Sequence, residues 1–248
     1  MSHFKLVFGF QTKVMKLSSI SLIAATFAAI TGSITAAPTP PPFERGVDIY
    51  SHANSHQDAL CATLDVAHRA KKLGCHEIAK LHEDDAEWLK HTHDPNHVKW
   101  SIKKSRESIA TLEHVEAAQL NRLAAPIAKR LGWNHVSECH DKCATDNDAH
   151  VGRPPNPDLV RYSKAQAHRT FHAEAFELSQ HAVLLAKKLG CPLDAQRYEE
   201  FATKNSAFAR GTPNPDFYQT SKAELETYIK AAQAELARAG KTCPIPRG

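Results

Sequence analysis

One short phrase recurs along the chain at a fixed interval. Ala-Lys-Lys-Leu-Gly-Cys occupies residues 70–75 and again 186–191, and the near copy Ala-Lys-Arg-Leu-Gly-Trp occupies 128–133. The glycines of neighbouring copies define the repeat period, since 132 − 74 and 190 − 132 both equal 58. A basic last turn followed by glycine is typical of a helix C-terminus, because the cations suit the helix dipole and glycine adopts the left-handed cap. The phrase therefore predicts three equally spaced helix ends.

Serines recur with the same spacing and indicate helix starts. Ser105, Ser163 and Ser221 follow one another at one repeat period, and each begins a run with helical periodicity, as expected of an N-cap. Pro-Asn-Pro-Asp precedes the last two, at 155–158 and 213–216, and is interpreted as a loop. Each unit is thus expected to contain a long helix, a glycine stop, a short helix and a proline-rich loop.

These signals predict an all-α fold of three tandem 58-residue long-helix/short-helix repeats with a closing C-terminal helix. No segment shows convincing strand alternation. The repeats can stack in an open array, or close into a compact bundle of long helices crossed by short ones. The long helices are expected at about 55–73, 102–131, 163–189 and 221–239, and the short ones at about 76–90, 134–145 and 192–206.

The N-terminal region has the plan of a secretory signal peptide. A basic start at Met15-Lys16 precedes an apolar stretch and small residues, and cleavage is expected after Ala36. A membrane anchor is the alternative, but Thr, Ser and Gly dilute the apolar stretch. We therefore expect a secreted, extracellular protein with no stable membrane insertion after cleavage. The expected organisation is a signal peptide over 1–36, in which 1–14 is an extension upstream of the start, a proline-rich leader over 37–46 and a single all-α repeat domain over 47–248.

Charge and motif content argue against two function classes. Lys and Arg number 31 and Asp and Glu 27, and loss of residues 1–36 removes three Lys and no acid, which leaves a net charge of +1. A nearly neutral body without a basic stripe argues against a nucleic-acid partner. The chain contains no His-Glu-x-x-His, Gly-x-Ser-x-Gly, P-loop or dinucleotide-binding motif. No enzymatic activity is therefore expected.

The six cysteines are expected to form three disulfides, because secreted chains fold in an oxidising compartment. About fifteen pairings are open. One arrangement joins Cys75 to Cys139, Cys143 to Cys191 and Cys61 to Cys243. Inside a cell, the close spacing of His135, Cys139, His140 and Cys143 would instead indicate zinc.

Histidines supply the candidate metal ligands. His56, His114 and His172 follow one another at one repeat period, and His52 and His168 are the i−4 neighbours of His56 and His172. On a helix, the i, i+4 spacing places two imidazoles on one face, where they can hold one metal ion. Duplication of a chance spacing would produce the same pattern.

Two further observations bear on the metal prediction. Ser55 and Asp58 have the spacing of a capping box, which would leave His52 outside the helix. The tract His-Thr-His-Asp-Pro-Asn-His at 91–97 is either a flexible metal-binding tract or a solvated loop. The predicted ligands for Zn, Cu or Fe ions, with no organic cofactor, are His52, His56, His91, His93, His97, His168 and His172.

The signal peptide, alanine-rich helices and abundant histidine resemble those of secreted histidine- and alanine-rich proteins of plant-associated fungi. This resemblance implies an effector-like protein with a part in metal-ion homeostasis and in virulence or symbiosis. The signature Arg-Ser-Ile-Asp-Glu-Leu-Asp of one such group is absent, since the chain ends Thr-Cys-Pro-Ile-Pro-Arg-Gly, so no residue role carries over. We therefore expect a secreted metal-binding protein or, alternatively, a non-catalytic, disulfide-stabilised interaction scaffold that binds a host or cell-wall protein.

Overall fold

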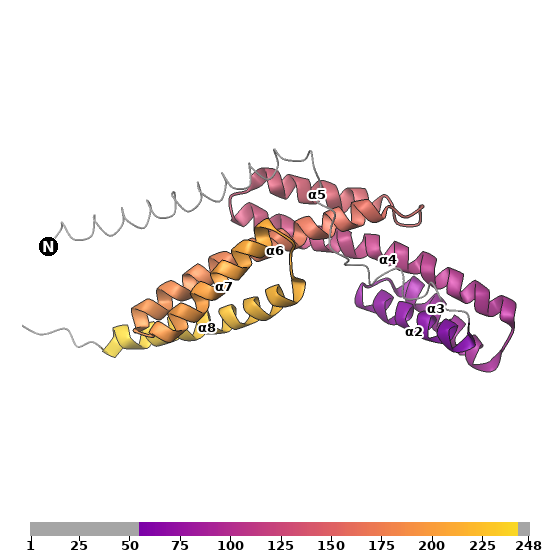
Figure 1. Cartoon of the computed structure of the whole chain (residues 1–248), viewed down its shortest axis with the longest axis horizontal. Helices are drawn as coiled ribbons and strands as arrows, with labels where there is room; N and C mark the ends of the chain where they lie inside the picture. The colour runs from indigo at the N-terminus through magenta and orange to yellow at the C-terminus, as the bar shows by residue number, and fades with distance from the viewer. Residues whose placement is uncertain (1–54, 243–248) are drawn as a thin grey trace, which may run out of the picture.

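The computed structural model describes residues 55–242, which form seven α-helices and no strand (Figure 1). The all-α prediction is therefore confirmed. No helix within these residues is long and apolar enough to cross a membrane. The expected signal peptide and leader, together with His52 and Cys243, lie outside the described residues. The helices are α2 (His56–Lys72), α3 (His76–His91), α4 (Pro95–Arg130), α5 (Asn134–Asp148), α6 (Pro157–Leu189), α7 (Pro192–Arg210) and α8 (Pro215–Thr242).

Long helices link neighbouring helix groups. Helices α2 and α3 pack against each other and against α4, α5 packs against α4 and α6, and α7 and α8 pack against α6. Figure 1 shows α4 running from the α2–α3 end to α5, and α6 running from α5 to the α7–α8 end. The described residues therefore form an elongated array rather than one bundle around a single core.

The apolar core is divided among these helix groups. One cluster surrounds Leu112, between α2, α3 and α4, and another surrounds Leu225, between α6, α7 and α8. Between them, Ala124 of α4 packs with Ala167 and Phe171 of α6. Because alanine has only a methyl side chain, the long helices approach closely at their crossings, and polar side chains there can reach from one helix to the next.

The long helices begin earlier than the serine pattern predicted. They begin at Pro95, Pro157 and Pro215, so the predicted proline-rich loops are in part helix starts. Proline suits the first helical turn, because it has no N–H to leave unpaired and its φ is already helical. Asn156 caps α6, since its Oδ1 accepts a hydrogen bond from the backbone N–H of Leu159 at 3.1 Å.

The equally spaced serines therefore do not cap helices. Ser105, Ser163 and Ser221 lie inside α4, α6 and α8 and are at most 1 % exposed. Ser163 Oγ accepts a hydrogen bond from Asn147 Nδ2 at 2.8 Å, and Ser221 Oγ accepts one from Asn205 Nδ2 at 3.4 Å. The spacing marked positions of structural importance, but their role is hydrogen bonding between helices.

The three predicted helix ends are confirmed. Gly74, Gly132 and Gly190 follow α2, α4 and α6 in the left-handed region, with φ of +74°, +80° and +70°. The backbone N–H of Gly132 donates to the carbonyl of Lys129 at 3.0 Å, as expected of a helix terminus.

Replacement of Gly132 measures the energetic cost of this cap. Gly132→Ala is expected to lower the free energy of unfolding by about 1 kcal/mol, because a Cβ strains the left-handed conformation. No neighbouring atom lies within 4 Å of that Cβ, so steric contact adds nothing. Urea denaturation measures the change, and Gly132→Asn is the control, since asparagine tolerates this conformation better. An equal loss in both variants would contradict the backbone explanation.

The predicted disulfides Cys75–Cys139 and Cys143–Cys191 are wrong. All five described cysteines are free thiols: Cys61, Cys75, Cys139, Cys143 and Cys191. Cys75 and Cys191 precede α3 and α7, whereas Cys139 and Cys143 lie on α5, which packs between α4 and α6. A shared position in the repeated phrase does not bring the three short helices together. The third predicted pair includes Cys243, which lies outside the described residues.

Candidate functional site

His114 of α4 lies at the centre of a buried hydrogen-bond network. It is 1 % exposed, and its Nδ1 is 2.9 Å from Asn147 Oδ1 on α5. Its Nε2 accepts a hydrogen bond from the backbone N–H of Asn156, the N-cap of α6, at 3.1 Å. Asn147 in turn donates to the carbonyl of Cys143 and to Ser163 Oγ, both at 2.8 Å. One imidazole thus joins α4, α5 and the start of α6.

A second network of the same composition lies one repeat period further along the chain. His172 is fully buried, with Nδ1 2.8 Å from Asn205 Oδ1 and Nε2 3.0 Å from the backbone nitrogen of Asn214. Asn205 Nδ2 donates to the carbonyl of Phe201 and to Ser221 Oγ. Helices α6, α7 and α8 are joined as α4, α5 and α6 are.

The contacts of His172 require a neutral imidazole with its proton on Nδ1. Asn205 uses its amide N–H groups as donors, so its Oδ1 accepts from His172 Nδ1, while the Asn214 N–H needs a lone pair on Nε2. Burial lowers the pKa of His172 below 6.5, and its hydrogen bonds to Asn205 and Asn214 oppose that shift only in part. Because both ring nitrogens are occupied, His172 has no free lone pair for a metal ion.

His56 makes different contacts from its two counterparts. Its Nε2 lies 2.5 Å from the carbonyl oxygen of Leu89 and 3.0 Å from that of Thr92, and its ring packs 4.4 Å from the ring of His93. Leu89 occupies the position that corresponds to Asn147 and Asn205, so no side-chain amide is present. The first histidine of the series therefore anchors the end of α3 through backbone carbonyls.

The capping box is confirmed at the start of α2. Ser55 Oγ accepts from the backbone N–H of Asp58, and Asp58 Oδ2 accepts from that of Ser55, both at 3.1 Å. Helix α2 consequently begins at His56, and His52 lies before it, outside the described residues. The pairing of His52 with His56 at one metal ion therefore stays a prediction.

Two buried histidines lie outside the predicted ligand set: His82, which the sequence pattern did not single out, and His140, which entered only the zinc alternative. His140 Nδ1 and Nε2 are both hydrogen-bonded at 2.8 Å, to Asn121 Oδ1 and Thr170 Oγ1, and burial lowers the pKa of His140 to about 4. His82 is fully buried, with Nε2 2.8 Å from Ser108 Oγ, and burial also lowers its pKa. His82 and His140 are one repeat period apart, so the repeat spacing contained the signal that would have identified them.

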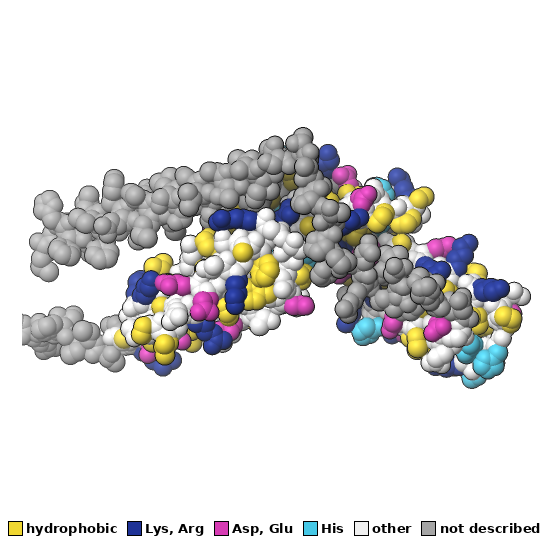
Figure 2. All heavy atoms as spheres, viewed as in Figure 1, with side chains coloured by type: hydrophobic (Ala, Val, Ile, Leu, Met, Phe, Trp, Pro, Cys, Tyr) yellow, Lys and Arg dark blue, Asp and Glu magenta, His cyan; other side chains and the backbone are white. Residues whose placement is uncertain are grey.

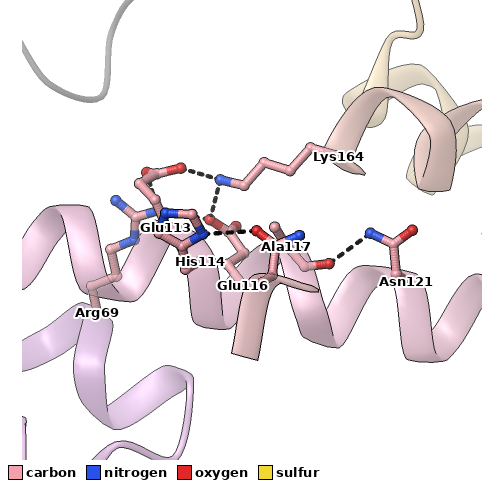
Figure 3. Close-up of polar contacts among 8 residues, drawn as sticks. Arg69, Glu113, His114, Glu116, Ala117, Asn121 and Lys164 are labelled. Carbon is pink, nitrogen blue, oxygen red and sulfur yellow. Dashed lines mark hydrogen bonds and ion pairs between the residues drawn. The ribbon is translucent and has the colours of Figure 1, made fainter. Parts of the chain in front are cut away.

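A cluster of matched charges lies at the crossing of α2, α4 and α6 (Figure 3). Arg69 of α2 and Lys164 of α6 each form ion pairs with Glu113 and Glu116, which both lie on α4. Glu116 Oε2 is 2.7 Å from Arg69 Nη2 and 2.6 Å from Lys164 Nζ. Burial raises the pKa of Glu116, but the charges of Lys164 and Arg69 outweigh burial, so the pKa is lowered. The two carboxylates are neutralised by cations from both neighbouring helices.

A corresponding cluster joins α4, α6 and α8. Lys222 Nζ lies 2.9 Å from Glu174 Oε2, which also accepts a hydrogen bond from Tyr218 at 3.0 Å, while Arg130 pairs with Glu174 Oε1. Burial lowers the pKa of Lys222, but the contacts with Glu174 and Tyr218 outweigh it and raise the value to about 12. Glu174 is the repeat counterpart of Glu116, and Lys222 is that of Lys164. These charges hold neighbouring long helices together.

The predicted metal ligands in the 91–97 tract contact carboxylates. His97 Nε2 lies 2.6 Å from Asp85, which is largely buried, and His91 Nε2 lies 3.2 Å from Glu87. His93 lies against His56, as described above. Each of these three rings thus contacts a different residue: Glu87, Asp85 or His56.

The other predicted pair lies in a different helix group. His168 packs beside Phe171, and its pKa is lowered to about 4, by burial and by the charges of His172 and Lys164, with Glu116 opposing. Its Nδ1 has no hydrogen-bond partner within residues 55–242. Among residues 55–242, no group of three or more His, Cys, Asp or Glu side chains is arranged to hold a metal ion. Metal binding by the seven histidines stays a prediction.

An exposed aromatic stack surrounds His97. The ring of His97 lies 3.6 Å from that of Trp88 on α3 and 5.3 Å from that of Trp100 on α4. The two indoles are 41 % and 46 % exposed. Asp85 holds His97 in place, since it also accepts a hydrogen bond from Ser101 Oγ at 3.1 Å. Two large aromatic rings are thus exposed to solvent on either side of a histidine that Asp85 holds by a hydrogen bond.

The rest of the surface is mixed in charge. Figure 2 shows basic and acidic side chains interspersed over the described helices on the face in view. Comparison with known proteins returned no match: no family model, no curated protein and no solved structure is significantly similar to this chain. The proposals below therefore rest on the residues and their contacts.

Proposed function

We propose that this chain is a secreted, non-catalytic helical scaffold that binds a host or cell-wall protein through the aromatic stack of Trp88, His97 and Trp100. The scaffold is proposed to consist of three 58-residue units. The repeated networks around His114 and His172, and the repeated ion pairs of Glu116 and Glu174, support this organisation. Each network joins a long helix to the next, so the array is held by polar contacts at its crossings.

The composition of α8 supports a closing role for this helix. Lys230 occupies the position that corresponds to the buried His114 and His172, and Gln233 the position of the fully buried Ala117 and Ala175. Capping units of repeat arrays carry a polar outer face. Long polar side chains at two positions that are buried elsewhere fit this requirement.

The exposed stack is the observation that carries the binding proposal. The counterparts of Trp88 in the following units are Asp146 and Lys204. The fold therefore does not require tryptophan at this position. Buried, rigid tryptophans dominate the binding energy of many protein interfaces, and a ring already fixed in place loses little entropy on binding.

Trp100 is replaced in the same way. Asp158 and Asp216 occupy its corresponding positions, both near helix starts where an acidic residue favours the helix dipole. The first unit thus has two tryptophans where the others carry charge. A specialised surface on one unit of a repeated scaffold explains this difference.

Metal binding by the clustered histidines is the second function proposed from the sequence, and the geometry favours it less. His172 uses both ring nitrogens in hydrogen bonds, and His97 is held by Asp85. His93, whose ring centroid lies 4.4 Å from that of His56, is the best placed of the predicted ligands.

Loss of the two indoles is expected to abolish partner binding. The immobilised chain should retain a protein from a host or cell-wall extract, and the variant Trp88→Ala/Trp100→Ala should not. With the retained protein purified, calorimetry is expected to show Kd weaker by at least about 30-fold in the variant, which corresponds to about 2 kcal/mol.

Leu193→Ala is the matched control, because Leu193 is an 81 % exposed apolar side chain on α7, away from the stack. Its binding should equal that of the parent. Circular dichroism should show unchanged helicity in both variants. If the tryptophan variant binds as tightly as the parent, the stack is not the binding surface.

A further inference from the structure

An open hollow lies between α7 and α8, in the helix group farthest from the aromatic stack (Figure 1). Its volume is about 560 Å³, which is within the range of small-molecule binding sites. The residues that line it are Tyr198 of α7 and Ala223, Glu224, Thr227, Tyr228 and Ala231 of α8. Comparison with the preceding unit shows what this hollow lacks.

The preceding unit covers the corresponding surface with apolar side chains. Ala173 of α6 occupies the position that corresponds to Ala231 and is only 7 % exposed. It belongs to one apolar cluster with Trp133 and Ala209, and Val136 of α5 packs against that cluster. An indole ring therefore takes part in covering this face of a long helix.

Smaller or polar residues replace these apolar side chains beside the hollow. Cys191 occupies the position that corresponds to Trp133, and Asp194 occupies that of Val136. Among residues 55–242, no helix follows α8 to pack on it as α7 packs on α6. Ala231 is consequently exposed. The hollow thus leaves room for an aromatic ring at a position where the preceding unit supplies one.

The two tyrosines of the hollow replace a hydrogen-bonded pair of the preceding unit. In that unit, His140 Nε2 lies 2.8 Å from Thr170 Oγ1. Tyr198 and Tyr228 occupy the corresponding positions, and their ring centroids are 4.5 Å apart. The hydroxyl of Tyr228 is buried and has no hydrogen-bond partner within residues 55–242. Because buried polar atoms in folded proteins are nearly always paired, this hydroxyl favours a ligand that supplies a partner.

The lining favours an uncharged ligand. Glu224 is the one charged residue among the lining residues, and its Oε1 and Oε2 each lie 2.8 Å from a nitrogen of the Arg197 guanidinium. A carboxylate bound through both oxygens in this way has its charge matched. The other lining residues offer aromatic rings, methyl groups and the hydroxyl of Thr227, which donates to the carbonyl of Ala223 at 2.8 Å.

We propose that this hollow binds an uncharged aromatic compound of one or two rings, whose single hydrogen-bonding group pairs with the Tyr228 hydroxyl. The ligand ring packs against Tyr198 and Ala231, on the surface that corresponds to the one covered by the cluster of Trp133 in the preceding unit. Indoles and phenols belong to this chemical class. The site uses no residue of the aromatic stack, so it goes beyond the proposed scaffold function.

The test is a titration of the full chain with indole, followed by ligand-observed NMR. Saturable binding to the parent is expected. Ala231→Phe fills the hollow and Cys191→Trp restores the residue of the preceding unit, so each should weaken binding at least about tenfold. Ala237→Phe is the matched control, because Ala237 is an exposed residue of α8 outside the lining, and it should bind as the parent does.

Tyr228→Phe tests the hydrogen bond. The variant should bind indole about fivefold more weakly than the parent does, because the indole N–H loses its acceptor. Its affinity for 1-methylindole, which has no N–H, should equal that of the parent. Equal weakening of both compounds would contradict the assigned role of the Tyr228 hydroxyl.

Circular dichroism is expected to show the same helicity in the parent and in all variants. The proposal is overturned if indole does not bind the parent, if Ala231→Phe and Cys191→Trp bind it as the parent does, or if Ala237→Phe loses it. Loss of indole binding in Trp88→Ala/Trp100→Ala would also overturn the proposal, because the ligand would then lie on the aromatic stack.

Discussion

Acidification from pH 7 to pH 4 is expected to lower the free energy of unfolding by several kcal/mol. The cause is a set of histidines that are neutral in the fold. His140 and His168 have pKa values of about 4, and burial also lowers those of His82 and His172. For His140 alone, the shift from 6.5 to about 4 corresponds to about 3 kcal/mol.

The direction of the effect follows from proton binding. Between pH 6.5 and about 4 the unfolded chain binds protons on these imidazoles and the folded chain does not, so acid favours unfolding. Stability from this source is complete above pH 6.5 and is lost progressively as the pH falls through this window. Protonation of His140 would also make both of its nitrogens donors, so the Thr170 hydroxyl would have to accept a hydrogen bond from Nε2.

Urea denaturation at pH 7, 6, 5 and 4 measures this loss. His140→Gln is expected to be less stable than the parent at pH 7 but to lose less stability on acidification, because one titrating group is gone. His135→Gln is the control, since the 82 % exposed His135 should leave the pH dependence unchanged. A parent protein with equal stability at pH 7 and pH 4 would show that these histidines are not buried neutral.

The sequence predicted helix ends better than helix starts, and the reason is local. A basic turn followed by glycine describes a terminus within a few residues, and Gly74, Gly132 and Gly190 were placed correctly. Ser163 and Ser221 looked like N-caps because the spacing singled them out, whereas the proline and asparagine that begin the helices were interpreted as loop. A capping serine and a buried serine at a crossing look alike in sequence.

The histidine pattern likewise located important positions but not their chemistry. The spacing of His114 and His172 predicted equivalent roles, and both are buried nodes. An imidazole can bind a metal ion only if one of its nitrogens is free of other hydrogen bonds. The partners of His114 and His172 are Asn147 and Asn205, each 33 residues further along the chain. Such a partner becomes apparent only when the packing of α5 and α7 is known.

The cysteines show the same limit. The disulfides were predicted only from the expected oxidising compartment. A disulfide also requires two cysteines at bonding distance, and the described cysteines, including Cys139 and Cys143 on α5, are free thiols. The aromatic stack could not be predicted because Trp88 and Trp100 belong to different helices. Their proximity depends on the crossing of α3 and α4 and on the contact of His97 with Asp85.

Replacement of His172, whose hydrogen bonds join α6, α7 and α8, is expected to be among the most destabilising single changes in the described residues. His172→Ala leaves Asn205 Oδ1 and the backbone N–H of Asn214 buried without a partner, at about 1–3 kcal/mol for each group. The lost ring also leaves a cavity beside Phe208 and Tyr218. A loss of about 3 kcal/mol or more in the free energy of unfolding is therefore expected in urea denaturation.

His114→Ala is the repeat counterpart and is expected to cost a similar amount, because its Nδ1 and Nε2 contact the corresponding atoms. His181→Ala replaces an exposed histidine of α6 and should change stability by less than about 0.5 kcal/mol. Similar losses at His114 and His172 would support the proposed repeat organisation. A loss confined to one of them would contradict it.

A double variant, His168→Ala/His172→Ala, separates a structural histidine from a metal ligand. If His172 acts only through Asn205 and Asn214, Zn²⁺ should raise the melting temperature of the parent and of His168→Ala/His172→Ala by the same amount, since neither protein has a site there. Stabilisation by Zn²⁺ that the double variant lacks would show that the imidazoles rearrange to bind metal. A metal ion bound to His172 would have to break its hydrogen bonds at 2.8 and 3.0 Å, and the loss of these bonds would lower the binding free energy.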